Sequence, residues 1–223
     1  MKVVSWNVRR LGGSEKRKEV RDLVREKVSC VVCIQETKLQ SCDDFMCSSI
    51  WGSQPHAYFF RPSVGASGGL LTIWDTSEVE VCFSASGDHY LLIHEQNKCF
   101  GIYHRGYNYW VKICLCGDFN AIRCREERRS IRGDHVSDNF DSFNEFIVDN
   151  VLIDLPLNGR KFTWYKGDGR SMSRLDRFLL SEEWCLMWPN GVRGNMLRKI
   201  VITCSLGSEA FAIVEVLAGY SWL

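Results

Sequence analysis

Residues 113–120 have the sequence ICLCGDFN, an apolar run that breaks off into Gly117-Asp118-Phe119-Asn120. A short apolar run that is bounded by turn residues predicts a buried β-strand. Loops that follow strands present polar side chains to clefts, so Asp118 and Asn120 are expected at the rim of a sheet. Other strand ends in the chain carry polar residues of the same kind.

Three more strand-like runs deliver a carboxylate or an amide. Asn7 closes the first run, Glu36 follows the second, and Asp176 lies within the stretch SRLDR. A single Asp or Asn after a strand is more often a turn residue than a catalyst. As a set they are chemically consistent, because a lone carboxylate such as Glu36 suits Mg²⁺ together with amide and water oxygens. A second carboxylate can orient or deprotonate water, and an amide can donate to a phosphate oxygen.

The remaining sequence predicts further strands with helices between them. A helix is expected from Ser14, another over residues 43–51 and a third from Ser137. Strands are expected over residues 58–60, 70–74, 79–83, 90–94, 100–103, 161–165, 173–180, 199–204 and 211–217. No linker or repeat interrupts the chain, so it predicts one domain over residues 1–223, of the α/β (α+β) class.

The charge of the chain limits its partners. The formal net charge is +1, and 25% of the residues are charged. Phosphate neutralisation dominates nucleic-acid affinity, so this balance argues against tight nonspecific DNA binding but allows a local basic groove. Residues 123–132 contain five arginines, but the interleaved Glu126 and Glu127 favour a solvated loop.

Several further expectations follow from composition. The apolar stretches are far shorter than a membrane span, and the N-terminus begins directly with a strand-like run and no signal peptide. Cys30 and Cys33 form a CxxC inside an apolar run, without a second pair at zinc spacing. The eleven cysteines therefore predict reduced, partly buried thiols. We expect an intracellular monomer without a membrane partner or a small organic cofactor.

Four short motifs resemble, in order and in placement at strand ends, those of the endonuclease/exonuclease/phosphatase superfamily. They are Ser5-Trp6-Asn7, Gln35-Glu36-Thr37, Gly117-Asp118-Phe119-Asn120 and Arg174-Leu175-Asp176. The intervening sequence is similar to the endonuclease domain of plant non-LTR (LINE-type) retrotransposons. This similarity is clearest in residues 67–75, in the KFTW of residues 161–164 and in residues 173–181.

The resemblance implies a four-layer αββα sandwich, in which two mainly antiparallel sheets are flanked by helices and the site lies at one rim. It makes Glu36 the principal ligand of Mg²⁺, with Mn²⁺ as the alternative metal, and Asn7 a further contact to metal and scissile phosphate. Asp118 would align or deprotonate the attacking water, and Asn120 would contact the phosphate. Asp176 would orient the histidine of the family. The implied reaction is in-line hydrolysis of a DNA phosphodiester, in the nucleus.

The C-terminal histidine of that family has no clear counterpart. All five histidines of the chain precede Asp176. In the best match to the family's Ser-Asp-His stretch, Glu209 replaces the aspartate as a metal ligand, Ala210 replaces the histidine and Ala212 replaces the following proline. Loss of one positioned acid–base group lowers the rate by about 10²–10⁴-fold. The sequence therefore predicts impaired or absent hydrolysis.

The middle of the chain is shorter than the resemblance requires. Only residues 104–117 stand where the family has a tyrosine and then a helix. Tyr103, Tyr107 or neither takes the place of that tyrosine. A missing helix predicts an uncovered apolar patch, with poor solubility or partner binding as its consequence.

Three hypotheses remain open at this point. The first is a nuclease-derived domain with weak or absent hydrolysis. The second is a noncatalytic nucleic-acid-binding module, which the near-neutral charge disfavours. The third is a phosphatase acting on small or lipid phosphoesters, because one fold can host both chemistries.

Overall fold

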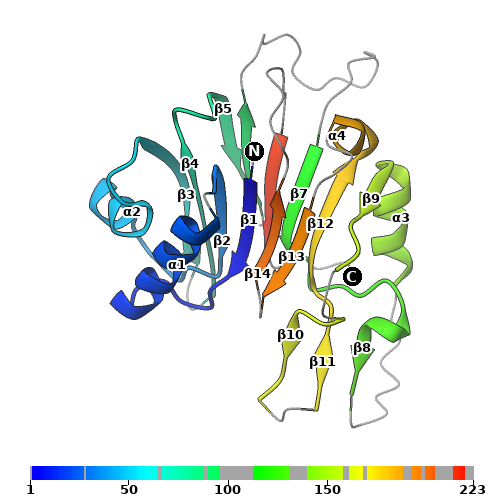
Figure 1. The fold of residues 1–223 in the computed structure, drawn as a ribbon. Helices are drawn as coiled ribbons and strands as arrows, with labels where there is room; N and C mark the ends of the chain where they lie inside the picture. The colour runs from blue at the N-terminus through cyan, green and yellow to red at the C-terminus, as the bar shows by residue number, and fades with distance from the viewer. Residues whose placement is uncertain are drawn as a thin grey trace.

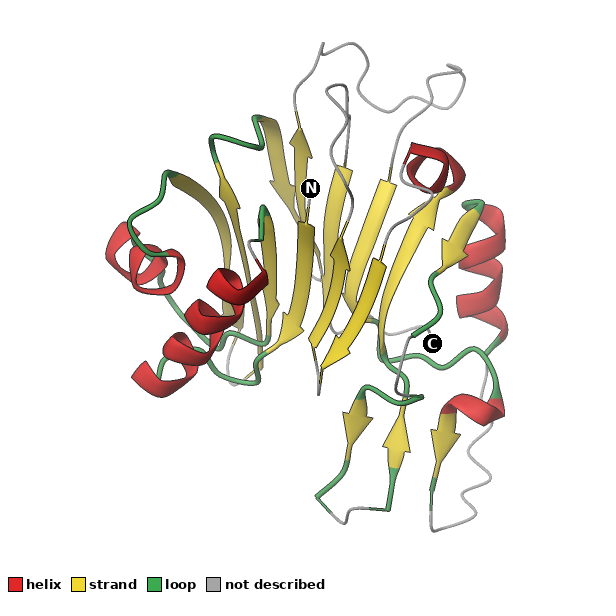
Figure 2. Cartoon of the chain, viewed as in Figure 1, coloured by secondary structure: helices red, strands yellow, loops and turns green. Residues whose placement is uncertain are grey.

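A computed structural model shows two β-sheets packed face to face, with helices on their outer faces (Figures 1 and 2). It describes residues 2–27, 29–64, 67–87, 90–95, 113–130, 140–157, 161–167, 170–187, 192–196, 199–203 and 213–218. Apolar side chains from both sheets fill the space between them, among them Val3, Val31, Leu91 and Phe178.

The first sheet has six strands in the order β13-β14-β1-β2-β4-β3. Their bounds are β1 (Lys2–Asn7), β2 (Val31–Gln35), β3 (His56–Val64), β4 (Ser67–Asp75), β13 (Val192–Met196) and β14 (Lys199–Thr203). β1 and β2 are parallel, with Asn7 paired to Gln35, and the other neighbours are antiparallel. Because parallel strands end at the same edge, Asn7 and Glu36 leave the sheet side by side.

The second sheet has six strands in the order β5-β6-β15-β7-β12-β9. Their bounds are β5 (Val81–Ser86), β6 (Tyr90–Glu95), β7 (Ile113–Asp118), β9 (Leu152–Asp154), β12 (Asp176–Ser181) and β15 (Ile213–Ala218). β7 and β12 are antiparallel, and Asp118 at the end of β7 pairs with Asp176 at the start of β12. This register places both carboxylates at one edge.

The helices bury apolar stripes on the outer faces. α1 (Ser14–Lys27) and α2 (Asp44–Trp51) pack on the first sheet, where Val20 and Leu23 join the apolar cluster of Val4 and Val32. α3 (Asp141–Asp149) packs its Phe143 on the second sheet, and α4 (Glu182–Met187) follows β12. None of the helices in the described part of the chain has the length and hydropathy of a membrane span.

A third, small sheet projects from the end of the sandwich at which β1 and β7 finish (Figure 1). It consists of β8 (Arg128–Arg129), β10 (Trp164–Tyr165) and β11 (Met172–Ser173), in the order β10-β11-β8. The short 3-10 helix η1 (Arg125–Glu127) leads into β8. We call residues 125–129 and the described part of residues 161–173, which include η1 and these three strands, the arm.

The predicted four-layer sandwich is confirmed, and the differences are local. The strand predicted over residues 161–165 is shorter, and the one predicted over 173–180 is divided between β11 and β12. Residues 123–132 are not simply a solvated loop, because η1 and β8 form within them and Glu127 is buried. Ser137, the predicted strand over residues 100–103 and the shortened middle up to residue 112 lie outside the described residues.

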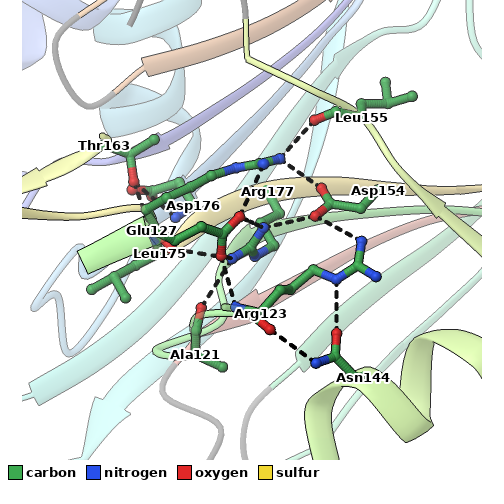
Figure 3. Close-up of polar contacts among 11 residues, drawn as sticks. Ala121, Arg123, Glu127, Asn144, Asp154, Leu155, Thr163, Leu175, Asp176 and Arg177 are labelled. Atoms are coloured by element: carbon green, nitrogen blue, oxygen red, sulfur yellow. Dashed lines mark hydrogen bonds and ion pairs between the residues drawn. The ribbon is translucent and has the colours of Figure 1, made fainter. Parts of the chain in front are cut away.

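A network of buried charges connects the arm to the second sheet (Figure 3). The Arg177 guanidinium, fully buried, donates to both oxygens of Glu127 and, at 2.7 Å, to Asp154 Oδ2. Arg174 bridges the same two carboxylates, at 3.1 Å to Glu127 and 2.7 Å to Asp154. Charges removed from water have to be paired, so these residues fix the relative positions of η1, β9 and β12.

The same network holds the chain just after the strand end of β7. Arg177 also donates to the carbonyl of Ala121 at 3.4 Å, and Glu127 accepts from the backbone amide of Arg123 at 2.7 Å. The Arg123 side chain donates to the Asn144 side chain of α3 over 2.9 Å. The segment that follows Asn120 is therefore anchored by buried charge.

We expect Glu127→Gln to lower the free energy of unfolding by about 3–5 kcal/mol, because Arg174 and Arg177 then share the carboxylate of Asp154, which compensates only part of their buried positive charge. The matched control is Glu19→Gln, which removes the exposed ion pair between Lys16 and Glu19 and should change stability by less than about 1 kcal/mol. Urea unfolding of both variants beside the wild type measures the difference. Equal, small effects would show that the network does not stabilise the fold.

The loss of stability caused by Glu127→Gln is expected to depend on pH. Burial opposes ionisation of Glu127, but the hydrogen bond and charge of Arg177 outweigh it, so the pKa of this carboxyl lies below its ordinary value. Its stabilising contribution is present above the unfolded pKa of about 4.3 and is lost as the pH falls through the lower folded pKa. The difference in stability between wild type and Glu127→Gln should therefore shrink below about pH 4.

Candidate active site

A hydrogen bond joins the two large sheets at the ends of two of their strands. Asn7 Nδ2, at the end of β1, donates to Asp118 Oδ2, at the end of β7, over 3.0 Å. The residues are 111 positions apart in the chain. Asn7 Oδ1 in turn accepts from the backbone amide of Arg9 at 3.2 Å, which orients the amide plane. Two of the predicted site residues are thus in direct contact.

Asn120 completes the environment of the Asp118 carboxylate. Its backbone amide donates to Asp118 Oδ1 at 3.0 Å, while its own side chain is exposed at the rim. Asn120 has a φ of 51°, in the left-handed region that asparagine tolerates better than most residues. Both oxygens of Asp118 are therefore held, and the turn that holds them is strained.

Glu36 lies at the neighbouring strand end and is held by the backbone of β4. Both of its carboxylate oxygens accept from the amide of Gly68 at 3.3 Å. Glu36 itself has a φ of 54°, a costly conformation for a residue with a long side chain. The backbone amides of Thr37 and Lys38 donate to the carbonyls of Gly69 and Gly68 over 3.1 Å each, which secures this conformation.

Gly69 is a site residue that was not identified from the sequence, because residues 67–75 were used only for their family similarity. Its φ is 85°, and a Cβ placed on it would lie 2.4 Å from Thr37 Oγ1. Only glycine allows β4 to approach the segment after Glu36 so closely. The Gly-Gly pair itself was the available signal, since glycine is the usual residue at positive φ.

Asp176 is buried at the start of β12, paired in register with Asp118. Thr163 Oγ1 accepts from the backbone amides of Leu175 and Asp176, at 3.0 Å each, and so fixes the turn between β11 and β12 (Figure 3). Thr163, also buried, was not predicted as a positioning residue, although it lies within the KFTW motif.

The environment of Asp118 favours a bound cation. Burial raises the pKa of this carboxyl, and the nearby charge of Glu36 raises it further. The hydrogen bonds from Asn120 and Asn7 and the charge of Arg9 lower the pKa, but they do not cancel the rise. A nearby cation would favour the ionised form of Asp118.

The residues present fit Mg²⁺, which is often bound by one or two carboxylates and completes its octahedron with water and phosphate oxygens. Within the described residues no cluster of three or more His, Cys, Asp or Glu side chains forms a metal cage. Glu36 and Asp118 with the Asn7 amide therefore form the candidate set. Glu209, the third predicted ligand, lies outside the described residues.

A histidine beside Asp176 is not found among the described side chains. His56, at the start of β3, contacts the carbonyl of Gln54 at 2.9 Å. Ala210 and Ala212 lie outside the described residues, as do Tyr103 and Tyr107.

The fold and the paired carboxylates at its rim define a four-layer sandwich with a candidate site for metal and phosphate. The chain belongs to the Endonuclease/Exonuclease/phosphatase family, whose model matches residues 4–194. No curated protein matches the sequence.

Solved structures with the same fold are similar over most of their length, at identities that establish the fold alone. AP endonuclease LMAP from Leishmania major has 15% identity and a TM-score of 0.66, over 90% of this chain and 86% of the other. The endonuclease domain of TRAS1, a telomere-specific non-LTR retrotransposon, has 11% identity and a TM-score of 0.61, over 92% and 98%. The 3′ phosphatase NExo from Neisseria, bound to a product DNA hairpin, has 12% identity and a TM-score of 0.68, over 92% and 100%.

We expect Gly69→Ala to destabilise the protein by more than about 2 kcal/mol, because positive φ and a steric clash act together. Gly68→Ala, with a φ of 77° and no atom within 4 Å of the added Cβ, should lose only about 1–2 kcal/mol. Gly12→Ala, with open space and no positive φ, is the control. Urea unfolding gives the order, and equal effects of Gly69→Ala and Gly12→Ala would contradict it.

Mg²⁺ or Mn²⁺ is expected to raise the melting temperature, by linkage worth about 2.7 kcal/mol at one hundred times the dissociation constant. Only the ionised carboxylates bind, so the effect is present above the folded pKa of Asp118 and is lost as the pH falls through it. Because that pKa is raised, the loss should begin above the ordinary aspartate value of about 3.9. Differential scanning fluorimetry across pH checks this.

Glu36→Gln and Asp118→Asn should each remove most of this cation effect, whereas the exposed Glu19→Gln should keep it. A shift of wild-type size in both site variants would place the cation elsewhere.

Proposed function

We propose that the chain is a metal-dependent phosphodiesterase domain of the DNA-endonuclease type, with impaired hydrolysis. The observation that carries this proposal is the contact of Asn7 with Asp118 across the two sheets, beside Glu36. Groups that can bind a cation and orient water come together from three strand ends, which is the arrangement that in-line phosphodiester hydrolysis requires.

Each predicted side chain has a role in this proposal. Glu36 is the principal metal ligand, and Asn7 supplies an amide oxygen to the metal or donates to the phosphate. A bound Mg²⁺ or Mn²⁺ would neutralise charge that develops on the phosphate. Asp118, held by two hydrogen bonds, orients or deprotonates the attacking water. The exposed Asn120 side chain contacts the phosphate, and Asp176 would orient an imidazole.

The arm supports a nucleic acid as the substrate over a small phosphoester. It exposes six basic side chains and one acidic side chain, that of Glu126, among the described residues; the basic ones are Arg125, Arg128, Arg129, Lys161, Lys166 and Arg170. The other acidic residue of this run, Glu127, is neutralised in the buried network. The sequence as a whole is near neutral, but this local surface can contact several backbone phosphates.

Retrotransposon ancestry, of the plant LINE type, is the finer part of the proposal. The motif similarity in residues 67–75 and 173–181 supports it, and the shared fold of the TRAS1 endonuclease domain is consistent with it. A domain of this ancestry would act on DNA in the nucleus.

The proposed lesion is the missing histidine. β15, the strand that follows Ala210, runs parallel to β7. Its first residue, Ile213, pairs with Ile113 at the start of β7, whereas Asp118 is the last residue of β7. The assignment of Ala210 to the place of the family's histidine therefore requires a direct test.

We expect the wild-type chain to nick supercoiled plasmid weakly or not at all in Mg²⁺, and Asp118→Ala to remove any nicking. Imidazole added to the wild type should increase Asp118-dependent nicking, because it replaces the missing proton-transfer group; the upper limit is about 10²–10⁴-fold. Ala210→His should give the same increase if Ala210 holds the histidine position. Gel electrophoresis of the plasmid forms measures all four reactions.

Efficient nicking by the unmodified wild type would contradict the proposed impairment. Salt-dependent DNA binding without turnover under any of these conditions would favour the noncatalytic module. Release of phosphate from a soluble phosphomonoester, without plasmid nicking, would favour a phosphatase.

A further inference from the structure

Two cysteine side chains are in contact at the start of α2. The sulfur atoms of Cys42 and Cys47 lie 3.4 Å apart. Cys47 is fully buried in the apolar cluster beneath α2, and Cys42 packs on the same cluster with part of its surface exposed. The thiol of a partly exposed cysteine thus lies directly against that of a buried one.

The capping of α2 explains why these two positions meet. Asp43 is the N-cap, and its carboxylate accepts from the amide of Met46 at 2.8 Å. Cys42 is therefore the residue before the N-cap, and Cys47 is the fourth residue of the helix. Side chains at these two positions normally pack together as a hydrophobic staple that fixes how the chain enters the helix. Here both halves of the staple are thiols.

We propose that Cys42 and Cys47 are a redox-active dithiol that closes to an intramolecular disulfide on reaction with a small-molecule disulfide. The sulfurs have to approach from 3.4 Å to the disulfide bond length of about 2.0 Å. This reactivity is independent of phosphodiester hydrolysis.

The surroundings assign different parts to the two thiols. The hydrogen bond with Cys47 lowers the pKa of the Cys42 thiol, against the opposing effects of burial and of Asp43. The same hydrogen bond and burial raise the pKa of Cys47. The thiolate is the attacking species, so the accessible Cys42 is the nucleophile and Cys47 the resolving thiol.

The reaction balances in two exchanges. The Cys42 thiolate attacks one sulfur of oxidised glutathione, forms a mixed disulfide and releases one glutathione thiolate. Cys47 then loses its proton and attacks the Cys42 sulfur, which releases the second glutathione. Two protein thiols are oxidised and one glutathione disulfide is reduced to two thiols.

Other buried thiols of the chain provide an internal contrast. Cys33, Cys114 and Cys116 lie between the two sheets with no exposed surface, where no small oxidant can reach them. Contact with solvent at Cys42, together with contact with a second thiol, distinguishes the pair at α2.

The test equilibrates the folded full-length chain with defined ratios of reduced and oxidised glutathione and then blocks free thiols with N-ethylmaleimide. Peptide mapping by mass spectrometry should find Cys42 joined to Cys47, with the loss of both of their maleimide adducts. Cys47→Ser should retain one glutathione on Cys42. Cys42→Ser should form neither the intramolecular disulfide nor this glutathione adduct. Cys124→Ser, at an exposed cysteine elsewhere, should behave as the wild type.

A wild-type map that shows stable glutathione on Cys42, or unmodified thiols at both positions across all ratios, would overturn the proposal. This map requires no variant, so the inference can be tested even if a serine substitution prevents folding.

Discussion

Buried charge at the junction of the arm and the second sheet is the constraint on which much of the structure depends. Arg177 lies with its whole side chain out of water, so Glu127 and Asp154 have to be placed around it. These carboxylates come from η1 and β9, and Arg174, just before β12, binds both. These contacts fix the position of the arm relative to the edge of the sheet. Arg177 also donates to the carbonyl of Ala121, so the backbone after Asn120 is fixed to the same network.

The rim of the sandwich has the opposite character, because it concentrates unfavourable features. Glu36 and Asn120 both adopt positive φ, and Asp118 is a buried carboxylate whose pKa is raised. None of these features stabilises the fold, and strain of this kind persists where surrounding contacts enforce it. The glycines of β4 and the amide of Asn7 supply those contacts.

The sequence predicted the fold class and the strand ends that meet, because apolar runs followed by Asn7, Glu36 and Asp118 are local signals. Parallel pairing of β1 with β2 places Asn7 and Glu36 together, and the resemblance to a known family indicated the two-sheet sandwich. The sequence could not predict the buried network, because Glu127 and Arg177 are 50 positions apart and a row of charges usually indicates solvent exposure. Nor could it predict how Gly68 and Gly69 hold Glu36, which depends on the register between two strands.

In the proposed mechanism, the groups that would hold the cation are different from the missing imidazole, so the chain can keep cation binding although one proton-transfer group is absent. Glu36, Asn7 and Asp118 lie at the ends of three strands whose positions depend on the sheets, and the proposed cation site needs no histidine. Burial raises the pKa of Asp118 and the charge of Glu36 raises it further, so a cation beside both carboxylates would favour the ionised form and link binding to stability. Loss of an imidazole removes a proton-transfer group but leaves the attraction of these carboxylates for a cation unchanged. We therefore expect a domain of this kind to retain its affinity for metal and phosphate after its rate of hydrolysis has fallen.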